Sequence, residues 1–328
     1  VNAIVLSGST VYAGGAFRSV GSSVTRNRLA AFNPDGTLST SWNPDAGGTV
    51  SAIAVSGSSV YVGGAFTTMG GVTRNRLAAI GTDGTLSATW NPNANNTVNA
   101  IAVSGSTVYV GGAFTTMGGS TIRNFVAAVG TDGTLSAAWN PNANSTVSAI
   151  TISGSMVYVG GSFTSMGGVT RNRLAAITTN GALSSWNPNA SATVNAIAVS
   201  GSTVYVGGSF GAIGGVARAY AAAIGADGTL LSWSPVAGST VNAIAVSGST
   251  VYLGGAFTTM GASSTTRNRL AAIGTDGTLL SWNPNASTTV SALAVSGTTV
   301  YAGGSFSSIG IRMRSMVAAF GADGNLLP

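Results

Sequence analysis

Cysteine, histidine, lysine, glutamate and glutamine are all missing from the 328-residue sequence. All 13 positive charges are arginines and all 7 negative charges are aspartates, so charged residues make up only 6% of the chain. An ordinary soluble domain has roughly 25%. The missing cysteines exclude disulfides and thiolate metal sites, and the missing histidines exclude a conventional zinc site as well.

The same absences restrict catalytic chemistry. General acid–base catalysis uses His, Glu, Asp, Lys, Tyr or Cys with a tuned pKa, and only aspartate and tyrosine are present here. Serine and threonine are abundant, but no histidine or lysine can activate a hydroxyl as a nucleophile. The inventory predicts a protein that is not an enzyme and holds no cofactor.

Long apolar runs are also absent. No run approaches the roughly 20 residues that cross a bilayer, so we predict no membrane span. The sequence opens at Val1 without methionine and shows no signal peptide, which predicts a removed leader or a mature part of a longer chain. A surface of serine, threonine, asparagine and glycine favours an extracellular or cell-surface location.

The sequence instead consists of one unit repeated seven times. The repeats are 1–49, 50–97, 98–146, 147–193, 194–240, 241–289 and 290–328. In the second repeat, VSAIAV ends at the hairpin signal Ser56-Gly57 and SVYVGGAF follows it. The longer loop TTMGGVTRN leads to RLAAIG, and Thr82-Asp83-Gly84 turns tightly into TLSATW. Asn91-Pro92 ends this last strand, because proline lacks a hydrogen-bond donor.

Four short strands in a unit of about 40 to 50 residues are typical of a propeller blade. No segment shows a helical period with caps. The alternatives are a β-solenoid, whose coils are usually shorter, and separate sandwiches, which need longer units. We therefore predict an all-β fold: a seven-bladed β-propeller of four-stranded antiparallel blades, forming a single domain over 1–328.

Aromatic residues recur at fixed places in the repeats. We expect the tryptophan that ends the fourth strand to cover the neighbouring blade and keep its N–H near water. The Gly-Gly pair of the second strand predicts a bulge or a close backbone approach. The recurring residues are Tyr12, Tyr61, Tyr109, Tyr158, Tyr205, Tyr252 and Tyr301; Phe17, Phe66, Phe114, Phe163, Phe210, Phe257 and Phe306; and Trp42, Trp90, Trp139, Trp186, Trp233 and Trp282.

The pattern VYVGGxF … RLAAIxxDGxLxxWNPNA resembles the bacterial delta-sixty repeats and their kelch-like propeller relatives. The resemblance covers all seven copies and implies an exported or surface-associated protein without a common activity. It implies no catalytic residues. The chain departs from enzymatic propellers such as galactose oxidase, which need Tyr, His and Cys around copper.

Six of the seven aspartates precede a glycine in the third turn of a repeat: Asp35, Asp83, Asp132, Asp227, Asp276 and Asp323. The fourth repeat has Asn180-Gly181 there, which indicates that the turn is needed rather than the charge. Asp45 is the exception and replaces an asparagine of the WNPNA segment. Calcium could bind through Asp, Asn and carbonyl oxygens, although these turns do not resemble an EF-hand loop. The Gly-Gly pairs lie inside a strand, which argues against a phosphate loop.

One arginine recurs in every repeat: Arg26, Arg74, Arg123, Arg171, Arg218, Arg267 and Arg314. A second occurs in four: Arg28, Arg76, Arg173 and Arg269. The first can bind carbonyls of the long loop or of the neighbouring blade, because a guanidinium has five donors. A ring of cations for an acidic glycan is the alternative. The second arginines, with the additional Arg18 and Arg312, are the ligand-binding candidates. Phe125 and Tyr220 replace the second arginine in their repeats. Without lysine clusters, nucleic-acid binding is not expected.

Four asparagines match the N-glycosylation pattern: Asn95, Asn144, Asn189 and Asn285. The last repeat ends GADGNLLP, so its fourth strand is short and lacks tryptophan. This predicts a bare edge that either stays short or is completed by a second subunit, with Val1, Asp323, Leu326 and Leu327 as assembly candidates. The sequence thus favours a self-assembling extracellular filament or surface-layer component, and the alternative is a glycan- or ligand-binding adhesin module.

Overall fold

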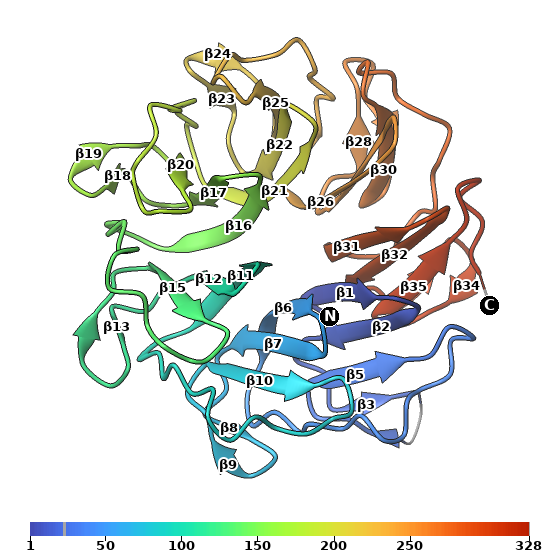
Figure 1. The fold of residues 1–328 in the computed structure, drawn as a ribbon. Helices are drawn as coiled ribbons and strands as arrows, with labels where there is room; N and C mark the ends of the chain where they lie inside the picture. The colour runs from blue at the N-terminus through green and yellow to red at the C-terminus, as the bar shows by residue number, and fades with distance from the viewer. Residues whose placement is uncertain (22–23, 328) are drawn as a thin grey trace. The chain divides into compact units, whose positions relative to one another are not determined.

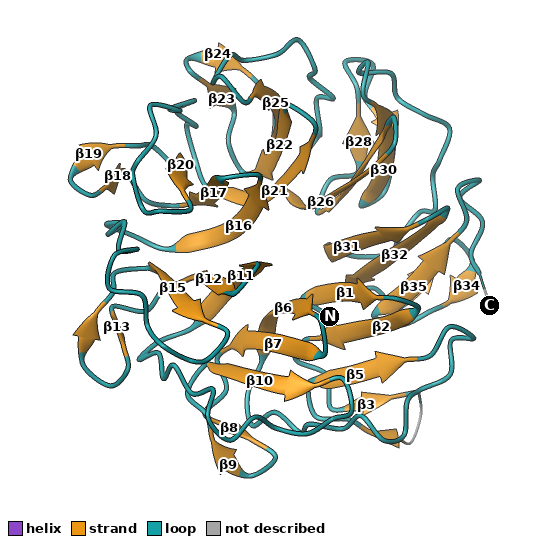
Figure 2. Cartoon of the chain, in the orientation of Figure 1, coloured by secondary structure: helices purple, strands orange, loops and turns teal. Residues whose placement is uncertain are grey.

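The computed structural model describes residues 1–21 and 24–327, and their regular secondary structure consists of strands joined by turns and loops (Figures 1 and 2). Pro328, the last residue of the seventh predicted repeat, lies outside the described residues. The chain divides into two compact units. The first comprises Val1–Val157, Ser165–Val169 and Ile177–Leu183, and the second comprises Tyr158–Thr164, Thr170–Ala176 and Ser184–Pro328. Both units contain part of the fourth repeat.

Each repeat has a first, a second and a third strand in a sheet whose central member is the second strand. The first strands are β1 (Ala3–Ser7), β6 (Val50–Ser56), β11 (Val98–Ser104), β16 (Val147–Ser153), β21 (Val194–Ser200), β26 (Val241–Ser247) and β31 (Val290–Ser296). The second strands are β2 (Thr10–Gly14), β7 (Ser59–Gly64), β12 (Thr107–Gly112), β17 (Met156–Gly161), β22 (Thr203–Gly208), β27 (Thr250–Gly255) and β32 (Thr299–Gly304). The third strands are β5 (Leu29–Phe32), β10 (Leu77–Gly81), β15 (Val126–Gly130), β20 (Leu174–Thr178), β25 (Ala221–Gly225), β30 (Leu270–Gly274) and β35 (Val317–Phe320).

The long loop between the second and third strands folds into a separate two-stranded hairpin. Its strands are β3 (Ser19–Val20) and β4 (Val24–Thr25), β8 (Thr68–Met69) and β9 (Val72–Thr73), β13 (Thr116–Met117) and β14 (Thr121–Ile122), β18 (Ser165–Met166) and β19 (Val169–Thr170), β23 (Ala212–Ile213) and β24 (Val216–Ala217), β28 (Thr259–Met260) and β29 (Thr265–Thr266), and β33 (Ser308–Ile309) and β34 (Arg312–Met313). In the second repeat, Gly70 and Gly71 have φ of 56° and 77° and make its turn. Glycine reaches such angles at little cost.

The predicted four-stranded blade is not confirmed, because each repeat shows a three-stranded and a two-stranded sheet. The predicted fourth strand TLSATW forms only one bridge, between Leu86 and Ile80 of β10. Two backbone bonds flank it, from Gly81 N to Thr85 O at 2.7 Å and from Ser87 N to Ala79 O at 2.9 Å. The segment then leaves the sheet and places Trp90 in the core. Sequence reasoning also treated the residues of the small hairpin as a loop.

The buried core lies between the sheets of consecutive repeats. In the first unit, one apolar cluster joins Tyr12 and Trp42 of the first repeat to Val60 and Phe66 of the second. In the second unit, Tyr252 and Trp282 are joined in the same way to residues of the seventh repeat. Within each unit, consecutive repeats therefore bury apolar surface against one another.

The Gly-Gly pair permits this close packing. A Cβ atom on Gly63 would lie 2.6 Å from Cγ1 of Val98 in the next repeat. The register between β6 and β7 shifts between Val50 and Ala52, which is a bulge beside the glycine pair. The predicted bulge and close approach are both confirmed.

The two ends of each three-stranded sheet differ. The first strand pairs antiparallel with the second, and the second with the third. The Ser-Gly and Asp-Gly turns therefore lie together at one end, which we call the turn end. The small hairpin, the segment after tryptophan and the arginines before the third strand lie at the other end, which we call the hairpin end.

Candidate functional site

The turn aspartates are bonded within their own turns. Asp83 Oδ1 accepts the backbone N–H of Thr85 at 2.9 Å. The hydrogen bonds from Thr85 hold the pKa of Asp83 below its ordinary value, and the carboxyl is exposed. Asp35, Asp132, Asp227, Asp276 and Asp323 also have lowered pKa values because of hydrogen bonds from the residue two positions on. The predicted turn role of these aspartates is confirmed.

The fourth repeat preserves this turn without a charge. The Asn180 side chain accepts a hydrogen bond from the Thr178 hydroxyl, and Gly181 N donates to Thr178 O at 2.9 Å. Asp45 lies at the hairpin end and accepts a hydrogen bond from Asn27 Nδ2 at 2.8 Å, as Asn93 accepts one from Asn75. Asp45 and Asn93 therefore accept the same hydrogen bond at equivalent positions of their repeats.

The arginine common to all repeats ties two parts of its own repeat together. Arg74 donates from NH1 to Thr73 O at 2.9 Å, and from NH2 to Ser87 O at 2.7 Å and Ala88 O at 3.2 Å. Arg26, Arg123, Arg171, Arg218 and Arg267 make the same two kinds of bond. Arg26, Arg74 and Arg123 are each only 7% exposed, so they cannot contact a large ligand.

This arrangement confirms that the arginine binds carbonyls, including one at the end of the long loop. Its second partner is the fourth segment of its own repeat rather than the neighbouring blade. The Nε–H of each of these six arginines is buried and has no acceptor among residues 1–21 and 24–327. Arg314 of the seventh repeat differs, because it is exposed and its guanidinium has no partner in that same part of the chain.

The second arginine occupies an unusual backbone conformation. Arg76 has φ of 67°, its N–H donates to Phe66 O at 2.9 Å, and its carbonyl accepts from Gly64 N at 3.0 Å. These two bonds hold the chain in the left-handed region that bulky residues seldom adopt. The equivalent residues of the other repeats have φ between 64° and 69°: Arg28, Phe125, Arg173, Tyr220, Arg269 and Met316. Nothing in the sequence signalled this conformation, because the residue types differ and none is glycine.

The ligand-binding candidates all lie at the hairpin end of their repeats. The side chains of Arg28, Arg76, Arg173 and Arg269 are half-buried, whereas Arg18 and Arg312 are exposed. Arg28 donates to Ala46 O at 2.7 Å, and Arg269 donates to Asn268 Oδ1 at 3.3 Å. The six side chains are thus distributed over separate repeats and make local contacts.

The four glycosylation candidates are exposed at the hairpin end, in the segment after tryptophan. Asn189 and Asn285 have φ of 61° and 64°, and their Oδ1 atoms accept from Asn172 and Asn268 at 2.8 Å. Asn95 accepts from the backbone N–H groups of Thr115 and Thr116. Asn144 accepts from Ser165 N at 3.0 Å.

Three of the four assembly candidates are bonded within their own repeat. In the first unit, Val1 is half-buried, and burial lowers the pKa of its ammonium group. In the second unit, Leu326 bridges Phe320 and packs against the apolar cluster, and Leu327 N donates to Ala319 O at 2.8 Å. Asp323 accepts from Asn325 N at 3.0 Å.

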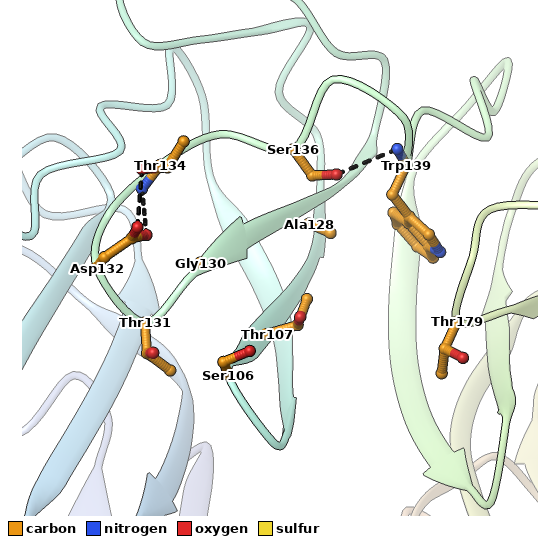
Figure 3. Close-up of a pocket in the computed structure, with 10 residues that line it drawn as sticks. All are labelled: Ser106, Thr107, Ala128, Gly130, Thr131, Asp132, Thr134, Ser136, Trp139 and Thr179. Atoms are coloured by element: carbon orange, nitrogen blue, oxygen red, sulfur yellow. Dashed lines mark hydrogen bonds between the residues drawn. The ribbon is translucent and has the colours of Figure 1, made fainter.

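A hollow of about 360 Å³ opens at the turn end of the first unit (Figure 3). Hydroxyl groups of Ser106, Thr107, Thr131 and Thr179 line it, with Asp132 and Trp139 at its sides. Trp139 is only 2% exposed, so its indole contributes little surface to the wall of the hollow. Sequence reasoning missed this feature, although the hydroxyls recurring around the Ser-Gly and Asp-Gly turns were visible.

No group of three or more metal-ligating side chains (His, Cys, Asp or Glu) occurs among the residues that the structure places. These residues also include no helix long and apolar enough to cross a membrane.

Comparisons with known proteins agree with the fold. Residues 9–41, 59–89 and 155–183 match the model of a β-propeller domain family of unknown function, DUF5122. No curated protein matches the sequence. The solved WD40 β-propeller domain of Doa1 is 12% identical, with a TM-score of 0.62, over 92% of this chain and 88% of that chain. The Neurospora crassa Pan2 WD40 domain is 9% identical, with a TM-score of 0.60, over 92% and 85%.

An extracellular domain of a putative one component system from B. thetaiotaomicron is 12% identical, with a TM-score of 0.58. The match covers 96% of this chain and 37% of that chain. These identities show a shared fold alone, and the delta-sixty and kelch-like resemblance stays a prediction. Repeated sheets, the family-model match and the WD40 neighbours together show that this chain is a β-propeller repeat protein.

Proposed function

We propose that this protein is a non-catalytic, exported structural β-propeller that assembles with copies of itself at or outside the cell surface. We also propose that its seven repeats are seven blades of one domain, each with the single-bridge segment as its fourth strand, as in delta-sixty and kelch-like proteins. The identical strand plan of the repeats supports this proposal.

The observation that carries self-assembly is the recurrence of exposed apolar side chains on the small hairpins. Val24, Val72, Ile122, Val169 and Val216 are between 43% and 65% exposed, and each lies in the second strand of a hairpin. In the seventh repeat, Met313 of β34 is 77% exposed. Exposed apolar groups that recur in this way favour protein–protein contact. The low charge of the chain gives little protection against association.

We expect these contacts to form through side chains rather than by strand addition. In six repeats the arginine covers the carbonyl that ends the second hairpin strand, as Arg74 covers Thr73 O. Strand addition needs such backbone groups free.

Electron microscopy and sedimentation at increasing protein concentration test the proposal. Filaments or sheets are expected for the wild type, and Val72→Thr, Ile122→Thr and Val169→Thr together should reduce them. The native fold already accepts threonine at both kinds of position. Thr265 of β29 occupies the position of Val72, and Thr73 of β9 occupies the position of Ile122. The reverse change Thr265→Val is the matched control and should promote assembly. A monodisperse wild-type monomer at high concentration would contradict the proposal.

A second candidate function is glycan binding, which the hydroxyl-lined hollow favours. Its carboxylate and hydroxyls can exchange hydrogen bonds with a sugar. A glycan array should then give hits that Asp132→Asn and Thr131→Ala weaken. Hits lost on Arg28→Ala or Arg76→Ala would instead indicate an acidic glycan at the hairpin end. An array without hits would exclude glycan binding both at the hollow and at the hairpin end.

A further inference from the structure

The charges of this chain are separated by sign between the two ends of the repeats. All six turn aspartates follow a third strand and lie at the turn end. All 13 arginines lie between a second and a third strand, at the hairpin end. Asp45 is the single aspartate at the hairpin end. The separation holds in each of the two units.

The separated charges do not neutralise one another within a copy. A third strand of five residues, such as β10, places the two ends about 15 Å apart. The Debye length at physiological ionic strength is about 8 Å. Among residues 1–21 and 24–327, no arginine forms an ion pair with an aspartate; the arginines bond chiefly to carbonyls and the turn aspartates to their own turns.

The charged groups at both ends are available to a partner. The six turn carboxylates are exposed, and one oxygen of each accepts the backbone N–H two residues on. In four of them the side chain two residues on also donates to the second oxygen: Asp132, Asp227, Asp276 and Asp323. A carboxylate has about four lone-pair sites, so each of these exposed groups can still accept a bond from a guanidinium. At the hairpin end, Arg18, Arg312 and Arg314 are exposed and the second arginines are half-exposed. The turn end therefore presents negative charge and the hairpin end positive charge.

We propose that copies of this chain associate head to tail, with the turn ends of repeats in one copy against the hairpin ends of repeats in the next, through contacts between aspartate carboxylates and guanidinium groups. This inference rests on the proposed self-assembly and adds a charge-based contact between the two ends to the apolar contact of the hairpins. Two different surfaces of one molecule make a heterologous interface, and such an interface grows into an open stack when its rotation does not close a ring.

The physics of exposed charges predicts how this association behaves. Each exposed pair contributes only about 0 to 1 kcal/mol, so several pairs must form together. Salt must weaken the stack, because the Debye length falls from about 30 Å at 0.01 M to about 3 Å at 1 M. Apolar contact between hairpins does not weaken in this way, so salt separates the two modes.

The chain offers a conservative way to remove the negative end. Asn180 holds the same turn without charge. We therefore design a turn-end variant in which Asp35, Asp83, Asp132, Asp227, Asp276 and Asp323 are all changed to asparagine. The matched control is Asp45→Asn, a change of the same type at the opposite end, where Asn93, Asn142, Asn189 and Asn285 already occur.

A hairpin-end variant removes the accessible positive charge. Arg18, Arg28, Arg76, Arg173, Arg269, Arg312 and Arg314 are changed to asparagine, which tolerates the positive φ of the second arginines. Circular dichroism and thermal unfolding check that both variants fold. Sedimentation velocity then measures the assembled fraction from 0.01 M to 1 M salt.

Wild-type protein and Asp45→Asn should associate at low salt. Their assembled fraction should fall at least tenfold at high salt. Each end variant alone should not associate in this salt-sensitive way. A mixture of the two variants should form pairs but no stacks of more than two copies, because each variant keeps only one charged end that can bind. Mixed variants that stay separate would overturn the head-to-tail arrangement.

Salt-independent wild-type assembly, or a turn-end variant that associates as the wild type does, would overturn this inference while leaving self-assembly intact. A wild type that associates at no salt concentration would overturn both.

Discussion

The indole Nε1 of Trp42 donates a hydrogen bond of 3.0 Å to the carbonyl oxygen of Gly81, 39 residues further along the chain. The same indole packs edge-on against Tyr12 of its own repeat, with ring centroids 4.9 Å apart. Trp90, Trp139, Trp186, Trp233 and Trp282 make the same bond to the next repeat. The expectation that this N–H stays near water was wrong, because the fourth segment directs the ring into the core.

Removing this bond should destabilise the fold. Trp42→Phe removes this bond and leaves a small cavity, while the Gly81 carbonyl keeps the bond from Gly84 N at 2.9 Å. A lost hydrogen bond costs about 0.5–1.5 kcal/mol, and lost packing adds to this. Equilibrium unfolding in guanidinium measures the change. Tyr220→Phe, which removes only a hydroxyl from a half-exposed ring, is the control. Equal losses for both variants would contradict the assigned role of the indole N–H.

The repeated arginine should matter wherever it is buried. Arg74→Met removes three hydrogen bonds to carbonyls and should cost about 2–4 kcal/mol. A single bond from a charged donor is worth about 1.5–3 kcal/mol, bonds made by one group are not additive, and methionine restores part of the packing. Arg314→Met is the matched control and should stay within about 0.5 kcal/mol, as exposed substitutions usually do. Chemical unfolding measures the stability of both variants. A large loss of stability for Arg314→Met would contradict the exposed, unbonded position of its guanidinium among the described residues.

The turn aspartates should make stability depend on pH in acid. Hydrogen bonds lower their folded pKa values below the ordinary 3.8, so the folded state favours the ionised form. This stability is present above pH 3.8 and is lost as the pH falls through the lower folded values. Thermal unfolding from pH 7 to pH 2 should therefore show a shallower decline in the six-asparagine variant. Asn180→Asp should steepen the decline, and no change in either variant would refute the assignment.

The glycine pair should tolerate no side chain at its first position. Gly63→Ala would place a Cβ 2.6 Å from Val98 Cγ1, and such overpacking costs about 1–3 kcal/mol. Gly211→Ala is the control, because no atom lies within 4 Å of the new Cβ and its φ is not positive. It should be neutral or stabilising by up to about 1 kcal/mol. Denaturant midpoints compare the two, and equal midpoints would argue against the close approach.

Local sequence patterns were sufficient to predict much of the fold. Ser56-Gly57 and Asp83-Gly84 predicted real turns, because each needs a backbone geometry that glycine supplies within a few residues. The all-β class and the repeated unit followed from the periodic sequence. The role of Asp83 in its turn was also predictable, since Asn180 replaces an aspartate at the equivalent position.

Contacts between segments distant in sequence were not predictable. Arg74 and Arg76 are two residues apart and chemically identical, yet one is buried among carbonyls and the other is half-exposed at positive φ. The difference arises from the backbone bonds of Arg76 to Phe66 and Gly64 and from the position of Ser87. Strands and turns depend on neighbours along the chain, whereas burial, the partner of an indole N–H and the separation of charge between two ends depend on how the repeats pack.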